Sequence, residues 1–282
     1  MGGAKLFFTV CTSVLIVSLV GKTFSLENLS LTKAEKQKLD QFKDAVSKSN
    51  FPAEWMQQEL TLVRYLRARE WDVRRAKSML LETVTWWEEN NMKDIHNEDW
   101  ASIEKDYPLH TDGVDKLGQP VIVLTFSEWD LRQAAVQGGM NRVIRWFIKG
   151  FDDVHLKSFE YHKLGKTNGT QWNVISNMDK LSRQQHLCIQ CLRFYTELAL
   201  TFESRYPGAI DKIYVVNAPS IFQVILGLVN PILSKSTLNA MQVLGTNKEE
   251  WGRSIYSHFS KDQLPESLGG TRSYSTAWNE IS

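Results

Sequence analysis

The chain contains three cysteines, of which Cys188 and Cys191 form a Cys-x-x-Cys motif. Two thiols at this spacing can supply half of a zinc site or can exchange a disulfide, as thioredoxin-type motifs do. Zinc would need a second pair of ligands, and only Cys11 remains. A thioredoxin-type motif should begin a helix that follows a strand. The strand predicted at 173–178 makes this arrangement barely possible. Because helical spacing begins at His186, we expect both cysteines within the helix, free or in a strained local bond, and serving mainly as small buried apolar side chains.

Residue patterns that would indicate an enzyme are absent from the sequence. It has no G-x-S-x-G, G-x-x-x-x-G-K-[ST], G-x-G-x-x-G or H-E-x-x-H motif. Its six histidines are scattered at His96, His110, His155, His162, His186 and His258. His155 and His162 fall on one helix face, where hydrogen bonding at the surface or between helices explains them better than a metal does. We therefore predict a noncatalytic binding module without cofactor or metal, and an uncharacterised hydrolase is a remote alternative.

The elements that would position these residues alternate between helices and strands. Helical spacing predicts a small bundle, and a mixture of short buried strands and longer helices follows it. The predicted helices of the bundle are 35–46, 54–69 and 73–90, and the later elements are strand 121–126, helix 140–154, strand 172–176, strand 213–216 and a further strand ending at 245. This order indicates an α/β fold in which helices cover a sheet.

The most apolar helix is predicted at Ser220–Val229, between Pro219 and Pro231. Apolar side chains occupy nearly every face of it, so water cannot surround it in the folded protein. Such a helix is either part of the core or a lid over an apolar ligand. Pattern alone favours the core.

Several motifs in order resemble the CRAL-TRIO lipid-binding family. They are RYPGAIDKIYVVNAP at 205–219, NPILSKSTLNAMQVLG at 230–245, QLPESLGGT at 263–271, LVRYLRAREWDVRRAKSML at 62–80 and DGVDKLGQPVIVLTF at 112–126. The sequence is most similar to the supernatant-protein-factor, or tocopherol-associated, branch. The resemblance covers roughly residues 35–273, and its several independent motifs make it specific.

The resemblance implies a carrier that binds a small hydrophobic lipid and transfers it between membranes, touching the membrane surface transiently. It implies an N-terminal helical module at 26–110 and a lipid-binding α/β domain at 111–282. A mobile gate helix would cover an apolar pocket with five side chains: Ile221, Phe222, Ile225, Leu228 and Val229. The alternative is an extracellular interaction protein that keeps this fold with a filled pocket.

Phosphatidylinositol-transferring members of the family recognise the headgroup with an Arg-Lys pair, a Glu and a second Lys. The resemblance carries the Arg onto Arg69 and the Glu onto Glu197, for which a salt bridge between the modules and a partner within the core are equal alternatives. The lysine positions hold Glu70 and Asn230. Replacing two cations by an anion and an amide disfavours a phosphate ligand. We therefore expect a neutral isoprenoid or sterol-like lipid, with phosphatidylcholine as the next choice.

The N-terminal segment predicts secretion. Lys5 precedes an uncharged run of 15 residues, Leu6–Val20, which is shorter than the roughly 20 residues that span a bilayer. We predict a signal peptide at 1–25, with an uncleaved signal anchor as the alternative. Two sequons, at Asn28 and Asn168, then become candidate glycosylation sites.

Composition is compatible with this interpretation and excludes little else. The chain has 282 residues, 43% of them hydrophobic, so it can bury a large core. Its formal net charge is only +1, which provides no general attraction for nucleic acid. We expect a monomer that binds no nucleic acid.

Overall fold

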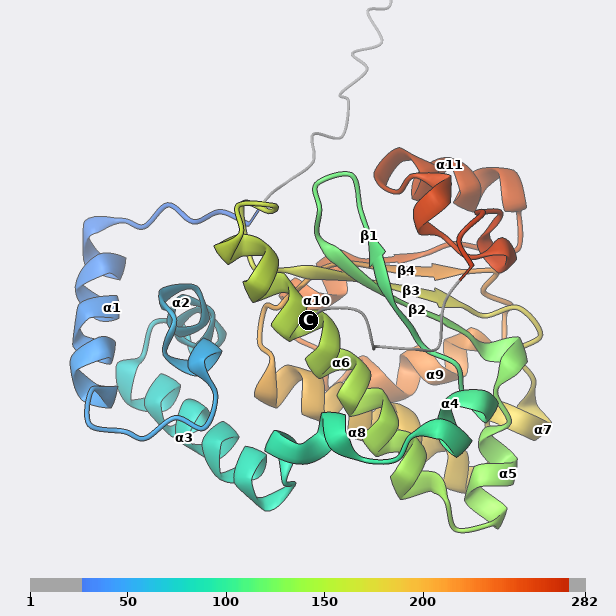
Figure 1. Cartoon of the computed structure of the whole chain (residues 1–282), viewed down its shortest axis with the longest axis horizontal. Coiled ribbons are helices and arrows are strands. Elements are labelled where there is room, and N and C mark those ends of the chain that lie inside the picture. The colour runs from blue at the N-terminus through green and yellow to red at the C-terminus, as the bar shows by residue number, and fades with distance from the viewer. Residues whose placement is uncertain (1–26, 274–282) are drawn as a thin grey trace, which may run out of the picture.

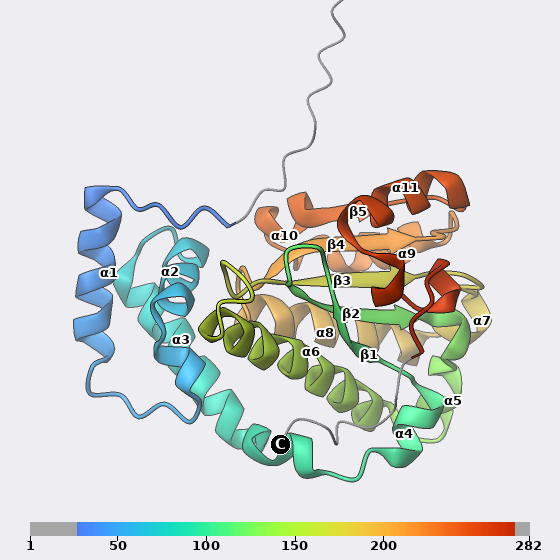
Figure 2. The same ribbon diagram turned by 45° about the horizontal axis from the view of Figure 1, so that its top comes forward.

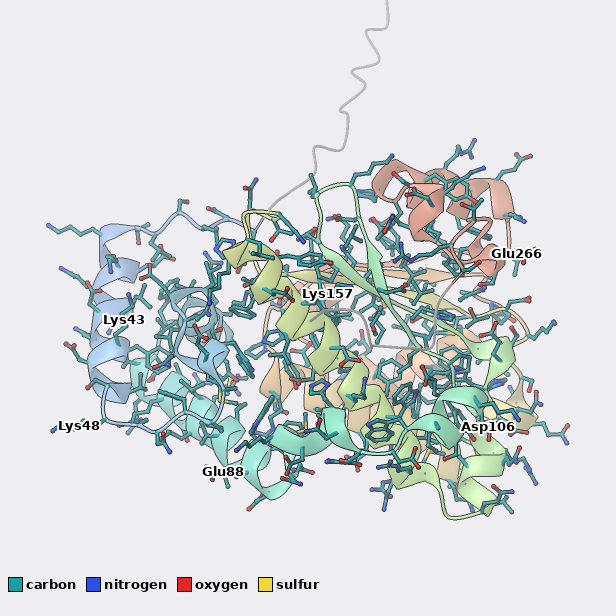
Figure 3. The ribbon with its side chains drawn as sticks, in the orientation of Figure 1. Lys43, Lys48, Glu88, Asp106, Lys157 and Glu266 are labelled. Atoms are coloured by element: carbon teal, nitrogen blue, oxygen red, sulfur yellow. A yellow bond between two sulfur atoms is a disulfide. The ribbon has the colours of Figure 1, made fainter. Side chains whose placement is uncertain are left out.

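The computed structural model describes residues 27–273. A bundle of helices formed by the first part of this range packs beside a helix-covered sheet (Figure 1). The predicted signal segment at 1–25 and residues 274–282 lie outside the described residues. Charged side chains such as Lys48, Glu88 and Glu266 project from the surface of both parts (Figure 3).

The N-terminal bundle forms where the apolar spacing predicts helices. Its first helix begins with a capping box, in which Thr32 and Glu35 each bond the other's backbone N–H. Asp72 accepts from the backbone N–H of Arg75 and caps the third helix. The segments are α1 Lys33–Val46, the 3-10 turn η1 Glu54–Gln57, α2 Glu59–Ala68, α3 Val73–Glu89, η2 Met92–Asn97 and α4 Ala101–Asp106.

Five strands form one sheet in the order β1-β2-β3-β4-β5. Strand β1 is antiparallel to β2, and all other neighbouring pairs are parallel. The strands are β1 His110–Val114, β2 Pro120–Thr125, β3 Trp172–Asn177, β4 Ile210–Val216 and β5 Met241–Val243. Strand β1 is not predicted from the sequence, because it is an edge strand whose Asp112-Gly113 pair is typical of a turn. Because β1 begins at His110, the predicted domain boundary between residues 110 and 111 falls within a strand.

Helices cover both faces of the sheet, as the sequence predicted. The long helices α6 and α8 lie on one side and α11 lies on the other (Figures 1 and 2). The covering segments are η3 Phe126–Glu128, α5 Leu131–Val136, α6 Met140–Lys163, α7 Arg183–His186, α8 Ile189–Arg205, α9 Phe222–Val229, α10 Lys235–Ala240, α11 Lys248–His258, η4 Lys261–Gln263 and η5 Glu266–Leu268.

Alternate residues of the strands enter two separate cores. In β4, Ile213 and Val215 face the large core that includes the α6 and α8 side chains, whereas Tyr214 and Val216 join Trp251 of α11 on the opposite face. The large core is continuous with the N-terminal bundle. The bundle and the sheet therefore share their apolar interior.

Candidate functional site

The apolar helix predicted at 220–229 is observed as α9. The backbone turns at Pro219, whose carbonyl oxygen accepts from the N–H of Phe222 at 2.9 Å. Phe222, Ile225 and Val229 are buried on one side of α9. Ile221 and Leu228, the other two predicted residues, are partly buried against the same core. The five apolar side chains of the proposed gate therefore face the interior together.

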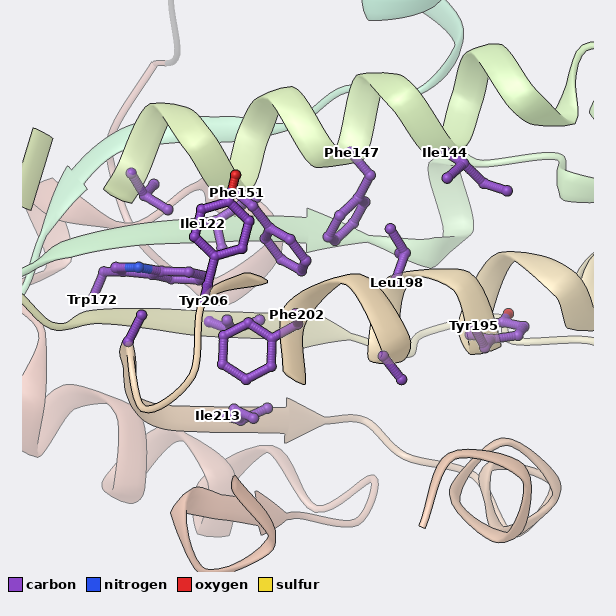
Figure 4. Packing of buried hydrophobic residues seen from close by; sticks show 14 of the residues in the cluster. Ile122, Ile144, Phe147, Phe151, Trp172, Tyr195, Leu198, Phe202, Tyr206 and Ile213 are labelled. Atoms are coloured by element: carbon purple, nitrogen blue, oxygen red, sulfur yellow. The ribbon is translucent and has the colours of Figure 1, made fainter. Parts of the chain in front are cut away.

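An aromatic cluster occupies the large core between α6, α8 and the sheet. Figure 4 shows Phe147 and Phe151 pointing from α6 toward Phe202 of α8 and Trp172 of β3. The ring centroids of Phe151 and Trp172 are 5.5 Å apart, and those of Phe151 and Phe202 are 6.0 Å apart. The rings meet edge-on or tilted, which are favourable arrangements. The predicted helix 140–154 and strand 172–176 contain three of these four rings, but the sequence does not indicate that they form one cluster.

Helix α9 packs against this core. It packs on α8, and its three buried residues belong to the same apolar cluster as the aromatic rings. Two clefts of about 450 and 410 Å³ lie instead beside the N-terminal bundle, and neither is lined by α9.

Within residues 27–273, the two predicted headgroup residues, Arg69 and Glu197, form no ion pair with each other. Arg69 follows the last residue of α2 and donates to the carbonyl oxygen of Ala68 at 2.9 Å. Glu197 accepts from Arg193 one turn earlier in α8, at 3.3 Å. Within residues 27–273 neither alternative, a salt bridge between the modules at Arg69 or a core partner for Glu197, is observed, because each side chain contacts its own helix.

The two residues at the expected lysine positions are exposed. Glu70 lies 3.8 Å from Arg75 and has 88% of its side chain exposed, in a turn where its φ is +53°. Asn230 caps the C-terminal end of α9. Neither residue carries a positive charge, and neither is buried in the core beneath α9.

The contact that ties the bundle to the sheet domain is made by Arg64, which sequence analysis did not single out. Arg64 is buried, forms an ion pair with Glu27 at 2.6 Å and donates to the carbonyl oxygen of Thr170 at 3.3 Å. Its stem packs against Gly208, whose positive φ of +67° favours glycine. A signal was present in the sequence, because Arg64 interrupts an otherwise apolar run, LVRYL.

A second polar contact joins the 3-10 segment η2 to α6. The ring nitrogens of His96 lie 2.8 Å from Asp152 and 2.9 Å from Asp153. Burial opposes protonation of His96, but the hydrogen bonds to the two carboxylates outweigh it and raise the pKa of His96 to about 9. His96 and Asp152 also line the 450 Å³ cleft, together with Trp55, Trp87 and Lys163. This cleft thus combines apolar walls with a paired imidazolium.

The expectation of hydrogen bonding for His155 is wrong. Its ring is buried edge-on against Trp55, with centroids 4.6 Å apart, and within residues 27–273 neither ring nitrogen has a hydrogen-bond partner. Burial lowers the pKa of His155 well below its ordinary value, so the ring is neutral. His162 contacts the carbonyl oxygen of Thr167 in the following loop.

The expected placement of Cys188 inside a helix is wrong, whereas Cys191 lies in the first turn of α8 as expected. Helix α8 begins at Ile189, and Cys188 is its N-cap. Cys188 and Cys191 form a disulfide, with Cα atoms 4.9 Å apart. The extended backbone at the cap lets Cys188 turn its sulfur toward the first turn, which two positions within a regular helix would not allow. The pair is therefore a covalent link and not simple apolar packing.

Both sequon asparagines are exposed. Asn28 lies before α1, where its side-chain oxygen accepts from the backbone N–H of Ser30. Asn168 lies in the loop between α6 and β3.

Among residues 27–273 no helix is long and apolar enough to cross a membrane, and no group of three or more His, Cys, Asp or Glu residues could hold a metal ion.

Comparison with known families identifies the fold. The model of the CRAL/TRIO domain matches residues 104–270, and that of the CRAL/TRIO N-terminal domain matches residues 38–82. The chain belongs to the CRAL/TRIO family. The first match includes the whole sheet and α9, and the second ends within α3. The crystal structure of Sfh5 has the same fold, with a TM-score of 0.58 at 13% identity over 79% of this chain and 84% of that one.

Several CRAL/TRIO relatives are longer than this chain. A CRAL-TRIO domain-containing protein of Caenorhabditis elegans, T23G5.2, is 27% identical over 74% of this chain, which spans 29% of that protein. The phosphatidylinositol/phosphatidylcholine transfer protein SFH9 of Arabidopsis thaliana is 23% identical over 74% of this chain and 36% of its own length. SEC14 cytosolic factor of Eremothecium gossypii is 23% identical over 256 residues, which are 88% of this chain and 80% of that protein.

Proposed function

We propose that this CRAL/TRIO chain binds one hydrophobic lipid between the aromatic core and α9, and transfers it between membranes without catalysing a reaction. The observation that carries the proposal is the buried face of α9, where Phe222, Ile225 and Val229 belong to the same apolar core as the aromatic rings. A helix so apolar can exchange its contacts with the core for contacts with a lipid or a membrane interface.

The relatives support a lipid ligand of this kind. SFH9 is named as a transfer protein for phosphatidylinositol and phosphatidylcholine. Opening of α9 would expose its apolar face, and contact with a membrane would stabilise the open state while lipid enters. The protein would touch the membrane transiently and act as a monomer.

We propose a neutral isoprenoid or sterol-like ligand, as in the supernatant-protein-factor or tocopherol-associated branch. Glu70 and Asn230 stand at the two positions where phosphatidylinositol-transferring members carry lysines, so a phosphate would lack two cations. Arg69 and Glu197 stay the candidates for contact with a polar end of the ligand. The branch and the ligand rest on these substitutions and on the resemblance.

Native mass spectrometry of the protein from a secreting host, followed by lipid extraction, tests the proposal. A single neutral lipid per chain is the expected result. Phosphatidylinositol as the dominant lipid would overturn the ligand class and would point to Arg69 as the main headgroup contact. A chain without any lipid that also fails to move a fluorescent lipid between vesicles would favour the alternative, an extracellular interaction protein with a filled pocket.

A further inference from the structure

The disulfide between Cys188 and Cys191 lies at the start of a long helix. Cys188 is the N-cap of α8, which runs for 17 residues, and its backbone is extended, with φ −63° and ψ 154°. Cys191 is in the first turn. The helix follows β3 and the short helix α7, so the motif opens a helix on the carboxyl side of a buried parallel strand.

This position favours negative charge on one sulfur of the pair. The backbone N–H of Cys191 points at Sγ of Cys188, with a distance of 3.1 Å from nitrogen to sulfur. The first turn of α8 contains no acidic side chain that would compete for its free N–H groups. After reduction, a thiolate on Cys188 would keep the N–H contact and gain the favourable field of the helix N-terminus.

The two sulfurs differ in access. Cys191 is fully buried, and its sulfur lies 3.7 Å from the carbonyl oxygen of Gln185, to which a reduced thiol can donate. Cys188 is only partly buried. The two residues between them are exposed, and 86% of Ile189 is accessible to solvent. An incoming thiol therefore reaches Cys188 first, beside an apolar side chain on which a polypeptide can pack.

We propose that Cys188–Cys191 is a redox-active disulfide that oxidises a dithiol of another polypeptide. A thiolate of the substrate attacks Sγ of Cys188. The Cys188–Cys191 bond breaks, a mixed disulfide forms on Cys188, and Cys191 leaves as a thiolate and takes up a proton. The second substrate thiol loses its proton and attacks the substrate sulfur of the mixed disulfide, which releases Cys188 as a thiolate.

The overall exchange balances without any further reactant. Two electrons pass from the two substrate thiols to the protein disulfide, and the substrate gains a disulfide. Of the two protons that the substrate thiols release, one is taken up by Cys191. The other is taken up by Cys188, or stays in solvent where Cys188 remains a thiolate. The direction follows from the helix, because stabilising the thiolate of Cys188 stabilises the reduced form and makes the disulfide a stronger oxidant.

Trapping of the mixed disulfide tests the assignment of the two roles. The full chain carrying Cys11→Ser serves as the background, and a reduced synthetic peptide with two cysteines serves as the substrate. We expect the background protein to oxidise about one equivalent of the peptide. The Cys191→Ser variant keeps Cys188 as a free thiol, so it is given a peptide whose single cysteine is activated as a 2-thiopyridyl disulfide. Cys188 should attack the peptide sulfur, release 2-thiopyridone and hold the peptide covalently, and Cys188→Ser should lower this trapping about tenfold or more.

A second measurement needs no substitution in the motif. The chain is partly reduced with glutathione, alkylated with iodoacetamide and mapped by mass spectrometry. We expect Cys188 to be alkylated about ten times faster than Cys191. The proposal is overturned if both cysteines react at equal rates, if the purified chain holds two free thiols, or if only dithiothreitol and not the peptide reduces the disulfide. The last outcome would leave a purely structural link.

Discussion

Nη2 of Arg64 lies 2.6 Å from Oε2 of Glu27, and only 3% and 9% of the two side chains are exposed. Glu27 precedes the first helix, and Arg64 projects from α2 toward the loop that carries Thr170. One buried ion pair thus holds the start of the described chain, the N-terminal bundle and the sheet domain together. The predicted signal cleavage after Ser25 would leave Glu27 as the second residue of the mature protein.

Replacing Arg64 with methionine should lower the free energy of unfolding by about 3 kcal/mol. The variant leaves the carboxylate of Glu27 largely buried without its main partner, which costs more than the pair itself contributes. Urea denaturation followed by tryptophan fluorescence measures the change. Arg67→Met is the matched control, because Arg67 contacts the same carboxylate at 3.3 Å with 32% of its side chain exposed, and it should cost less than about 1 kcal/mol. Equal stability of Arg64→Met and the unmodified chain would contradict the assigned role.

Stability should fall as the pH rises from about 7 to 10, because His96 loses its proton. The folded pKa of His96 is raised from 6.5 to about 9. Its contribution is therefore fully present below about pH 6.5 and is lost as the pH rises through 9. We expect a loss of about 2 kcal/mol over this range. His96→Gln, which cannot titrate, should be less stable than the unmodified chain at pH 7, and the difference should shrink toward pH 10. A constant difference across this range would show that His96 is not protonated in the folded protein.

Charges on the buried side of α9 should slow lipid transfer. We expect Phe222→Asp combined with Ile225→Asp to reduce the rate of transfer of a fluorescent lipid between vesicles about tenfold, because each carboxylate opposes docking into an apolar interface. Gln223→Glu is the control, since Gln223 is exposed on the same helix, and it should leave the rate nearly unchanged. Circular dichroism must show that the double variant is folded. Unchanged transfer by a folded double variant would remove α9 from the mechanism.

Expression in a secreting cell line should release a chain that begins near Leu26 and carries a glycan on Asn168. Asn168 is exposed in the loop before β3. Glycosidase treatment should therefore increase the mobility of the secreted protein, and Asn168→Gln should reduce this shift. Thr170→Val removes the same sequon without changing Asn168 and should act alike. Protein found only in the cytosol, unglycosylated and with Met1 intact, would refute the prediction of secretion.

Local patterns in the sequence predicted most of the elements. The spacing of Leu39, Phe42 and Val46 predicted α1 and its buried face, and the β-branched run at 213–216 predicted the buried end of β4. These signals are reliable because each depends on one segment burying one face. Strand β1 was missed, since its own residues carry little apolar pattern and its pairing with β2 stabilises it. The start of α8 was placed too early, so Cys188 was not recognised as a cap.

By itself the sequence determined the family, the order of helices and strands, and the presence of one helix so apolar that it must be covered in the folded protein. These properties depend on residues close to one another in the chain. The tertiary structure alone decided that Arg64 pairs with Glu27, 37 residues away, and that the rings of α6 and α8 form one cluster beneath α9. It also decided that Arg69 and Glu197 each contact their own helix. Such contacts follow from how the elements pack in three dimensions, and residue spacing along one segment carries no record of which distant side chain will meet it.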